Sequence, residues 1–401
     1  MEKKTNRAAI EFSLTWSSDV ATHTDRSFVE KIDFWRDYFP GNMEEGVTEL
    51  DVHEMYAEKF APGTIVPPFL ERNIVQFSNK LFAFPGGKKS MRASPGKFYP
   101  KGFAWKALNT FPQDTTPCRI IDATETTLTA DINHPLSRFP LTIEAKLTQH
   151  LNPANQRGGS INDIAEMITA NGPGMQIPST ALRNTLAANY PFQRENEADD
   201  DFFYASPRLV HHLDQTARQH VQNTYLRLLK PGTKILDLMS SWESHLPDSL
   251  RDCKITGLGL NEEELTQNKQ LSNHIVHNLN KYPKLPFPDH SFDAVICTVS
   301  IEYLSHPYEV MQEISRVLRE QGICVIIVSD RWFPGKQIQP WSDLHPFERQ
   351  ALLLDYFIRD KSFGLLQTES TRGYPRPIDD AHVLSTRYAD PIFTVWGTKT
   401  S

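Results

Sequence analysis

The stretch that decides the fold runs from Leu285 to Gly322 and reads LPFPDHSFDAVICTVSIEYLSHPYEVMQEISRVLREQG. Its first part is a turn followed by a short apolar run, DAVICTV, of the length and composition of a buried strand. Its second part, PYEVMQEISRVLRE, has apolar residues at helical spacing and begins with proline, as helices often do. Another apolar run, GICVIIVS, follows directly. The stretch therefore predicts a strand–helix–strand unit.

The same alternation extends towards the N-terminus. The runs KILDLM (234–239) and KITGLGL (254–260) are further buried strands, and residues 205–229 carry a helical pattern that ends at Lys230-Pro231-Gly232. Strands that alternate with helices indicate a parallel sheet wound with helices on both faces. In such sheets, ligands bind at the carboxyl ends of the strands, where the strand order reverses.

Residues 1–150 have a different texture. Proline is frequent, and the short alternating runs IEFSLTW, CRIIDATETTLTADI and LTIEAKL are bounded by turn residues. This pattern predicts a mostly antiparallel β domain. We expect three parts: a β domain at 1–150, a linker or cap segment at 151–204 and an α/β domain at 205–401. The fold class is therefore α/β, preceded by a β domain.

The composition excludes several classes of function. With 42 Lys and Arg against 49 Asp and Glu, the 401-residue chain has a formal charge of −7, which argues against a nucleic-acid binder. The four cysteines have no zinc-ligand spacing and the histidines no metal-ligand spacing, so no metal is expected. The start of the chain is polar and no apolar stretch approaches the ~20 residues of a membrane span. We expect a cytoplasmic protein without a membrane partner.

The 285–322 stretch resembles the class I S-adenosylmethionine (SAM)-dependent methyltransferases, most closely the type 11 group. The Leu-Pro-Phe turn, the Phe-Asp strand and the helix end at Arg316-Val317-Leu318 carry this resemblance. It extends back through KILDLM and KITGLGLNEEEL. It implies a Rossmann-like fold, SAM as cofactor and methyl transfer as the activity. It also implies a cofactor site built from Asp237, Leu238, Met239, Ser240, Ser241, Asn261, Glu262, Asn278, Leu279 and Val299.

The cofactor loop departs from the family pattern. Asp237 holds the family's acidic place, but Met239, Ser241 and Glu243 stand where the family has glycines, which let the methionine part of SAM lie against bare backbone. We therefore expect either that Met239 turns its side chain into the sheet or that the loop moves outward. Ser240 and Ser241 would donate to the SAM carboxylate.

Two further cofactor places also differ. Gly259 stands where the family has the carboxylate that binds the ribose hydroxyls, and Asn261 is the nearest replacement, with Glu262 as runner-up. Asn278 stands in for an aspartate near the adenine. The motif SSWESH is similar to that of a subgroup with LDLMSSWxSHLP in place of the glycines. Polar residues thus remain at the altered places.

The resemblance also implies an acceptor side of the site. In the same subgroup a motif like SDRWFPGKQIQPW follows the last core strand, and here it spans 329–341. The residues expected to contact the acceptor are Tyr204, Arg208, Arg331, Lys336 and Trp341. The candidates for a catalytic base are Tyr303, His245 and Asp330, because a hydroxyl acceptor must lose its proton during transfer. The expected acceptor is a small molecule, with a peptide or protein client as the other possibility.

The front domain has its own resemblance. ADINHPLSRFPLTIEAKL (130–147) is similar to the last hairpin of SlyD-like FKBP domains, with Asn133, His134, Pro135 and Leu136 matching and Arg138 in place of the turn glycine. The resemblance implies an N-terminal SlyD-like domain. An alternative function is therefore an FKBP-type peptidyl-prolyl isomerase or chaperone with a non-catalytic methyltransferase-like scaffold. A third possible function is that of a sensor, which binds SAM without transferring its methyl group.

Overall fold

The computed structural model describes residues 6–84, 93–153, 159–170, 172–179 and 192–400. The chain divides into two compact units. The first, which we call the β unit, holds residues 1–19, 23–189 and 347–351. The second, the α/β unit, holds residues 20–22, 190–346 and 352–401. The boundary near 190 falls inside the segment expected as a linker, of which residues 154–158, 171 and 180–191 lie outside the described residues.

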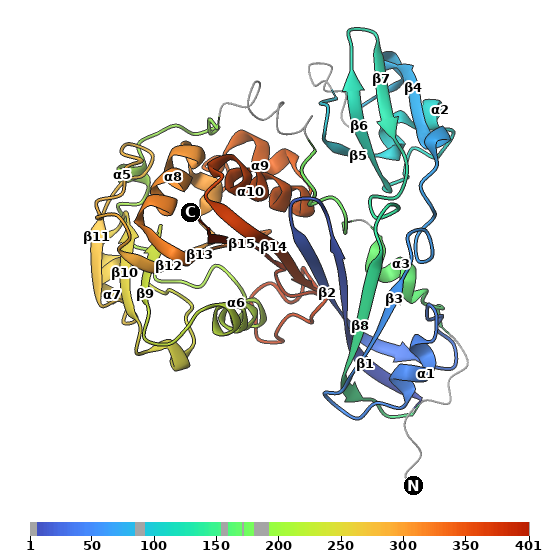
Figure 1. The fold of residues 1–401 in the computed structure, drawn as a ribbon, viewed down its shortest axis with the longest axis horizontal. Helices are drawn as coiled ribbons and strands as arrows, with labels where there is room; N and C mark the ends of the chain where they lie inside the picture. The colour runs from blue at the N-terminus through green and yellow to red at the C-terminus, as the bar shows by residue number, and fades with distance from the viewer. Residues whose placement is uncertain (1–5, 85–92, 154–158, 171, 180–191, 401) are drawn as a thin grey trace. The chain divides into compact units, whose positions relative to one another are not determined.

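The β unit contains two sheets (Figure 1). One has the order β2-β1-β8-β3 and is formed by Thr22–Asp33, Arg7–Ser17, Leu141–His150 and Met55–Phe60. The other has the order β4-β7-β6-β5, from Ile74–Ser78, Thr127–Asp131, Pro117–Ala123 and Phe98–Pro100. β8 pairs antiparallel with β1 and β3, and every pair of the second sheet is antiparallel. A mostly antiparallel front part is therefore confirmed.

Alternation along the strands builds the core of the first sheet. In β8, every second residue from Leu141 to Leu147 is buried, as expected when one face of a strand packs on a core. The helices of this unit are short. They are α1 (Met43–Thr48), η1 (Glu71–Asn73), η2 (Asn79–Leu81), η4 (Lys101–Ala104), α2 (Trp105–Leu108) and α3 (Ile164–Thr169).

The α/β unit has seven strands in the order β11-β10-β9-β12-β13-β15-β14 (Figure 1). They span Asn273–Val276, Lys254–Gly259, Lys234–Leu238, Phe292–Thr298, Leu318–Ser329, Ile392–Lys399 and Phe363–Arg372. The strands from β11 to β13 are parallel, and β15 is antiparallel to both of its neighbours. The chain moves outward from β9 to β11 and then returns to β12 on the other side of β9. The strand order therefore reverses at β9, and the Rossmann-like expectation is confirmed.

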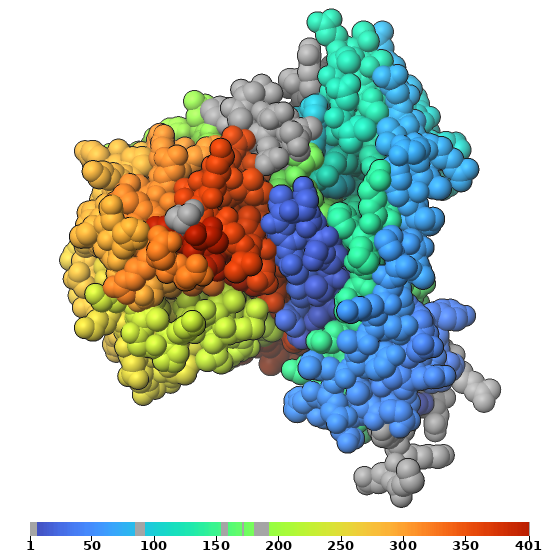
Figure 2. All heavy atoms as spheres, viewed as in Figure 1, coloured from blue at the N-terminus to red at the C-terminus, as the bar shows by residue number. Residues whose placement is uncertain are grey.

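Helices pack against this sheet. Ala217, Val221 and Tyr225 of α6 join residues of the sheet in one buried core. In Figure 2 the yellow-green surface that includes α6 lies directly below the orange and red surface of the C-terminal segments. The helices of this unit are α5 (Asp200–Phe203), α6 (Gln215–Leu228), η5 (Asp248–Leu250), α7 (Glu262–Gln267), η6 (Ile301–Tyr303), α8 (Pro307–Val317), α9 (Gln339–Asp343) and α10 (Pro346–Asp360), of which residues 347–351 are assigned to the β unit. No helix among the described residues is long and apolar enough to span a bilayer.

Candidate functional site

A pocket of about 410 Å³ opens in the α/β unit beyond the carboxyl ends of β9, β10 and β12. This is where the strand order reverses, so the pocket lies where such sheets bind ligands. Thirteen residues singled out from the sequence line it: Tyr204, Arg208, Asp237, Met239, Ser240, Ser241, His245, Asn261, Asn278, Leu279, Val299, Tyr303 and Arg331. Five others do not line it: Leu238, Glu262, Asp330, Lys336 and Trp341.

Asp237 supports the loop that follows β9. Its carboxylate is buried and accepts hydrogen bonds from the hydroxyls of Ser240 and Ser244, both at 2.6 Å. Burial raises the pKa of Asp237, although the two hydroxyl donors oppose the shift. Ser240 and Ser244 thus hold the acid in place beneath the loop.

The backbone at the pocket is strained at three positions. Met239, His245 and Val299 have positive φ angles of 57°, 55° and 47°, a region that residues with a Cβ adopt at a cost. Such strain concentrates at functional sites. Met239 takes this turn directly after β9 and lines the pocket.

Gly259, at the end of β10, has no room for a side chain. A Cβ built there would lie 2.2 Å from the carbonyl oxygen of Ser240. The Ser240 N–H donates to the Leu258 carbonyl at 2.8 Å, which fastens the β9 loop to β10. The altered loop therefore occupies the space that a strand-end carboxylate would need.

Asn261 begins α7. Its side-chain oxygen accepts from the Glu264 N–H at 3.0 Å, which is the usual role of an N-cap residue. Its amide donates to the carbonyls of Tyr204 and Ala205 at 2.7 and 3.2 Å. Glu262 is exposed and contacts His274 at 2.9 Å, away from the pocket.

Glu264 also lines the pocket, and the sequence analysis missed it. It is 8% exposed and accepts hydrogen bonds from the Arg208 N–H and the Ser241 hydroxyl, each at 2.7 Å. The signal in the sequence was a glutamate three residues after an N-cap, which by itself indicates only a capping box.

Asn278 connects the β11 end to the segment before α6. Its amide donates to Asp201 at 2.7 Å, and its side-chain oxygen accepts from the N–H groups of Asn280 and Lys281 at 3.0 and 3.2 Å. Leu279, the next residue, is buried and presents an apolar surface to the pocket.

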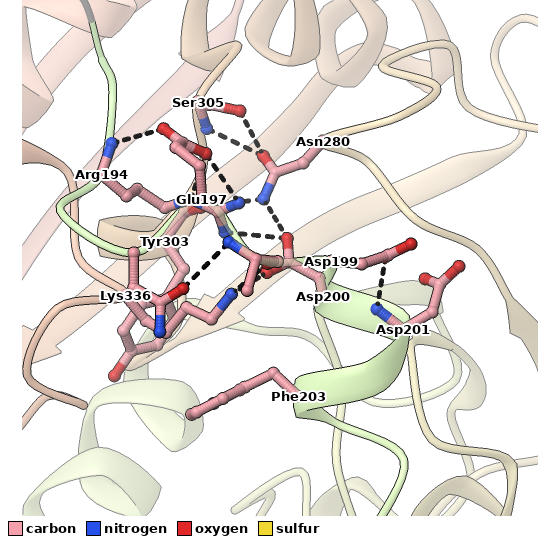
Figure 3. A network of polar contacts seen from close by, with 12 residues as sticks. Arg194, Glu197, Asp199, Asp200, Asp201, Phe203, Asn280, Tyr303, Ser305 and Lys336 are labelled. Carbon is pink, nitrogen blue, oxygen red and sulfur yellow. Dashed lines mark hydrogen bonds and ion pairs between the residues drawn. The ribbon is translucent and has the colours of Figure 1, made fainter.

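Asp200 lies at the centre of a polar network beside the pocket (Figure 3). Arg194 donates to both of its oxygens at 2.8 Å, Lys336 donates at 2.9 Å and Asn280 at 2.9 Å. Although burial opposes it, the hydrogen bonds from Asn280, Arg194 and Lys336 lower the pKa of Asp200. Lys336 is fully buried, so its charge serves this network and does not reach the pocket.

Two other residues of the 329–341 loop also lie away from the pocket lining. Trp341 is fully buried in α9, and Asp330 is exposed just after β13. The sequence could not separate these residues from Arg331, because a loop has no periodicity that tells which side chains face inward.

Aromatic rings form one wall of the pocket. The Tyr303 ring stacks on Phe333 with centroids 5.8 Å apart, and its hydroxyl accepts from the Phe333 N–H at 2.9 Å. Burial raises the pKa of Tyr303 well above its ordinary value. The Arg208 guanidinium lies 4.6 Å from the Phe203 ring centre and 5.1 Å from that of Phe333, within cation–π range. This wall combines apolar surface with a positive charge.

A carboxylate between two imidazoles stands at the other end of the β9 loop. Glu243 Oε2 lies 2.9 Å from His211 Nδ1 and 3.4 Å from His245 Nδ1. Burial works against it, but the contact with His245 and the nearby positive groups lower the pKa of Glu243. All three residues line the pocket, so the structure brings His245 to the site beside a carboxylate partner.

Comparison with known proteins agrees with this geometry. Residues 242–326 match the family model described as a methyltransferase domain. This span runs from the loop after β9 to the middle of β13. Over these residues the α/β unit is similar to methyltransferase domains. This match lies outside the β unit, whose FKBP identity remains a prediction.

Two relatives have methyltransferase names. The ubiquinone/menaquinone biosynthesis C-methyltransferase UbiE of Laribacter hongkongensis is 26% identical over 37% of this chain and 63% of its own length. The cycloartenol-C-24-methyltransferase of Arabidopsis thaliana is 28% identical over 30% of this chain and 38% of its own. The chain thus spans less than two thirds of either relative. A SAM-dependent methyltransferase structure from Archaeoglobus fulgidus is 14% identical, with a TM-score of 0.34, over 45% of this chain and 94% of its own.

Proposed function

We propose that the chain is a SAM-dependent methyltransferase whose α/β unit binds SAM in the pocket at the reversal of the strand order. The observation that carries the proposal is the convergence in one pocket of residues following β9, β10, β11 and β12, most of which lie within the region matched by the methyltransferase family model. A volume of about 410 Å³ is within the range of small-molecule and cofactor sites.

The residues present fit the cofactor in their chemistry. Ser240 and Ser241 line the pocket beside the bend at Met239; their hydroxyls and the Ser240 N–H are bonded to Asp237, Glu264 and Leu258, so the Ser241 N–H is the donor proposed for the cofactor carboxylate. Asn278 and Leu279, at the β11 end, offer an amide and an apolar surface for the adenine. Gly259 leaves the backbone of β10 bare where the loop passes close. The polar replacements thus supply partners where the family's glycines and acids are missing.

When bound, SAM supplies an electrophilic methyl group on a sulfonium sulfur. The chain then has to hold the acceptor in line and exclude water. Tyr303 and Phe333 close one side of the pocket with stacked rings. His245 beside Glu243 is the group best placed to take a proton, because it lines the pocket and a carboxylate partner orients its imidazole.

We infer that the acceptor is a small molecule. The relatives act, by their names, in quinone biosynthesis and on cycloartenol. On this chain the pocket wall formed by Tyr204, Tyr303 and Phe333 offers aromatic surface, and Arg208 and Arg331 add positive charge. This wall suits an acceptor with a flat apolar body and an anionic or strongly polar group. A peptide client remains the second candidate acceptor.

For the β unit, we propose a SlyD-like FKBP domain. The supporting observation is the segment that carries the resemblance: buried Asn133 exchanges hydrogen bonds with the backbone of Leu70 at 3.0 and 3.1 Å and donates to Asp131 at 2.8 Å. The His134 ring accepts from the Leu136 N–H at 3.1 Å. The matching residues thus have a defined role in shaping the turn before β8.

The test is calorimetric titration of the whole chain with SAM and with its demethylated product, S-adenosylhomocysteine (SAH). We expect saturable 1:1 binding of both. Incubation of a metabolite extract with methyl-labelled SAM would then transfer label to a small molecule in the presence of the chain. Binding without transfer to any metabolite or protein would favour a sensor. No heat at millimolar ligand would favour the non-catalytic scaffold.

A further inference from the structure

The pocket lacks the strand-end carboxylate that the family resemblance implies for the ribose. Gly259 occupies that place, and the Ser240 carbonyl, 2.2 Å from the position of a Cβ there, excludes every larger residue. The obstacle is fixed, because the Ser240 N–H is bonded to the Leu258 carbonyl at 2.8 Å. If a carboxylate binds the ribose hydroxyls, it comes from another element.

Four carboxylates line the pocket among the described residues, and three are committed elsewhere. Asp200 is surrounded by Arg194, Lys336 and Asn280. Asp237 lies buried beneath the β9 loop, bonded to two serine hydroxyls. Glu243 stands between two histidines on the β9 side. The remaining carboxylate, Glu264, follows β10, the strand whose end the ribose acid normally occupies.

Glu264 is turned towards the pocket by specific contacts. As the third residue after the N-cap Asn261, it would reach back to the cap N–H in a capping box. Instead Oε1 accepts from the Arg208 N–H and Oε2 from the Ser241 hydroxyl, each at 2.7 Å. Its own N–H still donates to the Asn261 side chain at 3.0 Å. The helix start is thus capped without the Glu264 carboxylate, which lines the pocket and accepts one hydrogen bond on each oxygen.

We propose that Glu264 is the ribose-binding carboxylate of this chain, moved from the strand end to the first turn of α7. The inference rests on the proposed function. A carboxylate has two oxygens with about four acceptor sites, and each Glu264 oxygen uses one. One further site on each oxygen matches the two neighbouring hydroxyl donors of a ribose. Asn261 suits this role less, because both N–H groups of its amide already donate and its oxygen has only one acceptor site left.

The test is a binding cycle that compares protein and ligand variants in the full chain. Calorimetry measures the affinity of SAH and of its 2′-deoxy and 3′-deoxy forms for the wild type and for Glu264→Gln. The control is Glu262→Gln, which removes a carboxylate from the same helix turn but away from the pocket. We expect Glu264→Gln to weaken SAH about 10- to 100-fold, the usual size of a hydrogen bond to a charged group. Glu262→Gln should match the wild type.

The deoxy ligands distinguish direct binding of the ribose by Glu264 from a purely structural role of Glu264. If Glu264 binds the ribose, at least one deoxy form loses affinity for the wild type but much less for Glu264→Gln, because the partner group is already gone. Equal weakening of all three ligands by Glu264→Gln would mean that Glu264 only ties Ser241 to Arg208, and would overturn the inference while the methyltransferase proposal stands. Absence of SAH binding to the wild type would overturn both.

Discussion

The hydroxyl of Tyr303 accepts a hydrogen bond from the N–H of Phe333 at 2.9 Å while their rings stack. This contact joins the turn after β12 to the loop after β13, the two elements that close the acceptor side of the pocket. The phenol keeps its own proton, since burial raises its pKa well above the ordinary value. Tyr303 is therefore suited to donate a hydrogen bond to an acceptor and unsuited to act as a base at neutral pH.

Removing that hydroxyl should affect turnover more than cofactor binding. We expect Tyr303→Phe to lower kcat about tenfold, the factor that ~1.4 kcal/mol represents, with the affinity for SAH unchanged. The measurement is steady-state methyl transfer with calorimetry of SAH in parallel. The contrary result would be a kcat that depends on pH near neutrality in the wild type but not in Tyr303→Phe. Such a difference would mean that the phenol loses its proton in this pH range.

The Asp200 network should make stability sensitive to acid. Its hydrogen bonds lower the folded-state pKa of Asp200 below the unfolded value of about 3.9. The stabilisation is therefore fully present above the unfolded pKa and is lost as pH falls through the folded pKa. We expect denaturant unfolding to show this loss below about pH 4. In Asp200→Asn, the contribution of Asp200 to this acid-dependent loss of stability should be missing.

The same variant tests the network at neutral pH. Asp200→Asn leaves Arg194 and Lys336 without their shared anion, and breaking a buried pair in this way costs about 3–5 kcal/mol. Asp248→Asn is the matched control, because its carboxylate is almost fully exposed. Equal stability of the two variants would mean that the network contributes nothing to folding.

The strained turn after β9 gives a third prediction. Met239→Gly restores a residue that accepts φ = 57° without strain, so we expect the fold to persist and SAH to bind at least as tightly as to the wild type. Leu365→Gly is the control: it relieves a φ of 50° at an exposed position of β14 that does not line the pocket. A tenfold loss of SAH affinity in Met239→Gly alone would show that the Met239 side chain itself holds the nucleotide.

The fourth prediction concerns Gly259, at the end of β10. A methyl group there meets backbone, so Gly259→Ala should push the Ser240 loop away, lower the free energy of unfolding by about 1–3 kcal/mol and weaken SAH at least tenfold. At Gly364 a Cβ meets only the side chain of Thr400, at 2.8 Å, which can rotate away. Gly364→Ala should therefore keep SAH affinity. Unchanged SAH binding in Gly259→Ala would contradict the tight loop described here.

The sequence was sufficient for the parts of the site that follow strands. The family resemblance implied Asp237, Met239 and Val299 as cofactor residues, and all three line the pocket. They lie at one edge because they follow buried strands, legible from their apolar runs, and parallel strands end at the same edge. Their binding of the cofactor stays a prediction. Contacts between side chains that are far apart along the chain could not be predicted from the sequence. Lys336 looked like a substrate-contacting charge, yet it is buried against Asp200, which lies 136 residues earlier in the chain.

The same limit hid Glu264. Its neighbours in the sequence predicted a helix start, but its orientation depends on Ser241 and Arg208, which come from two other elements. A single sequence carries no signal for contacts between segments that are distant along the chain. The strained φ angles at Met239 and Val299 were likewise hidden, because methionine and valine do not favour positive φ.

The most direct test of the central claim is a crystal structure of the full chain grown with SAH. We predict density for the nucleoside in the pocket beyond β9, β10 and β12, with the amino-acid end beside Ser240 and Ser241 and the adenine beside Asn278 and Leu279. A complex with SAH bound elsewhere, or with the pocket closed by the Met239 side chain, would contradict the account.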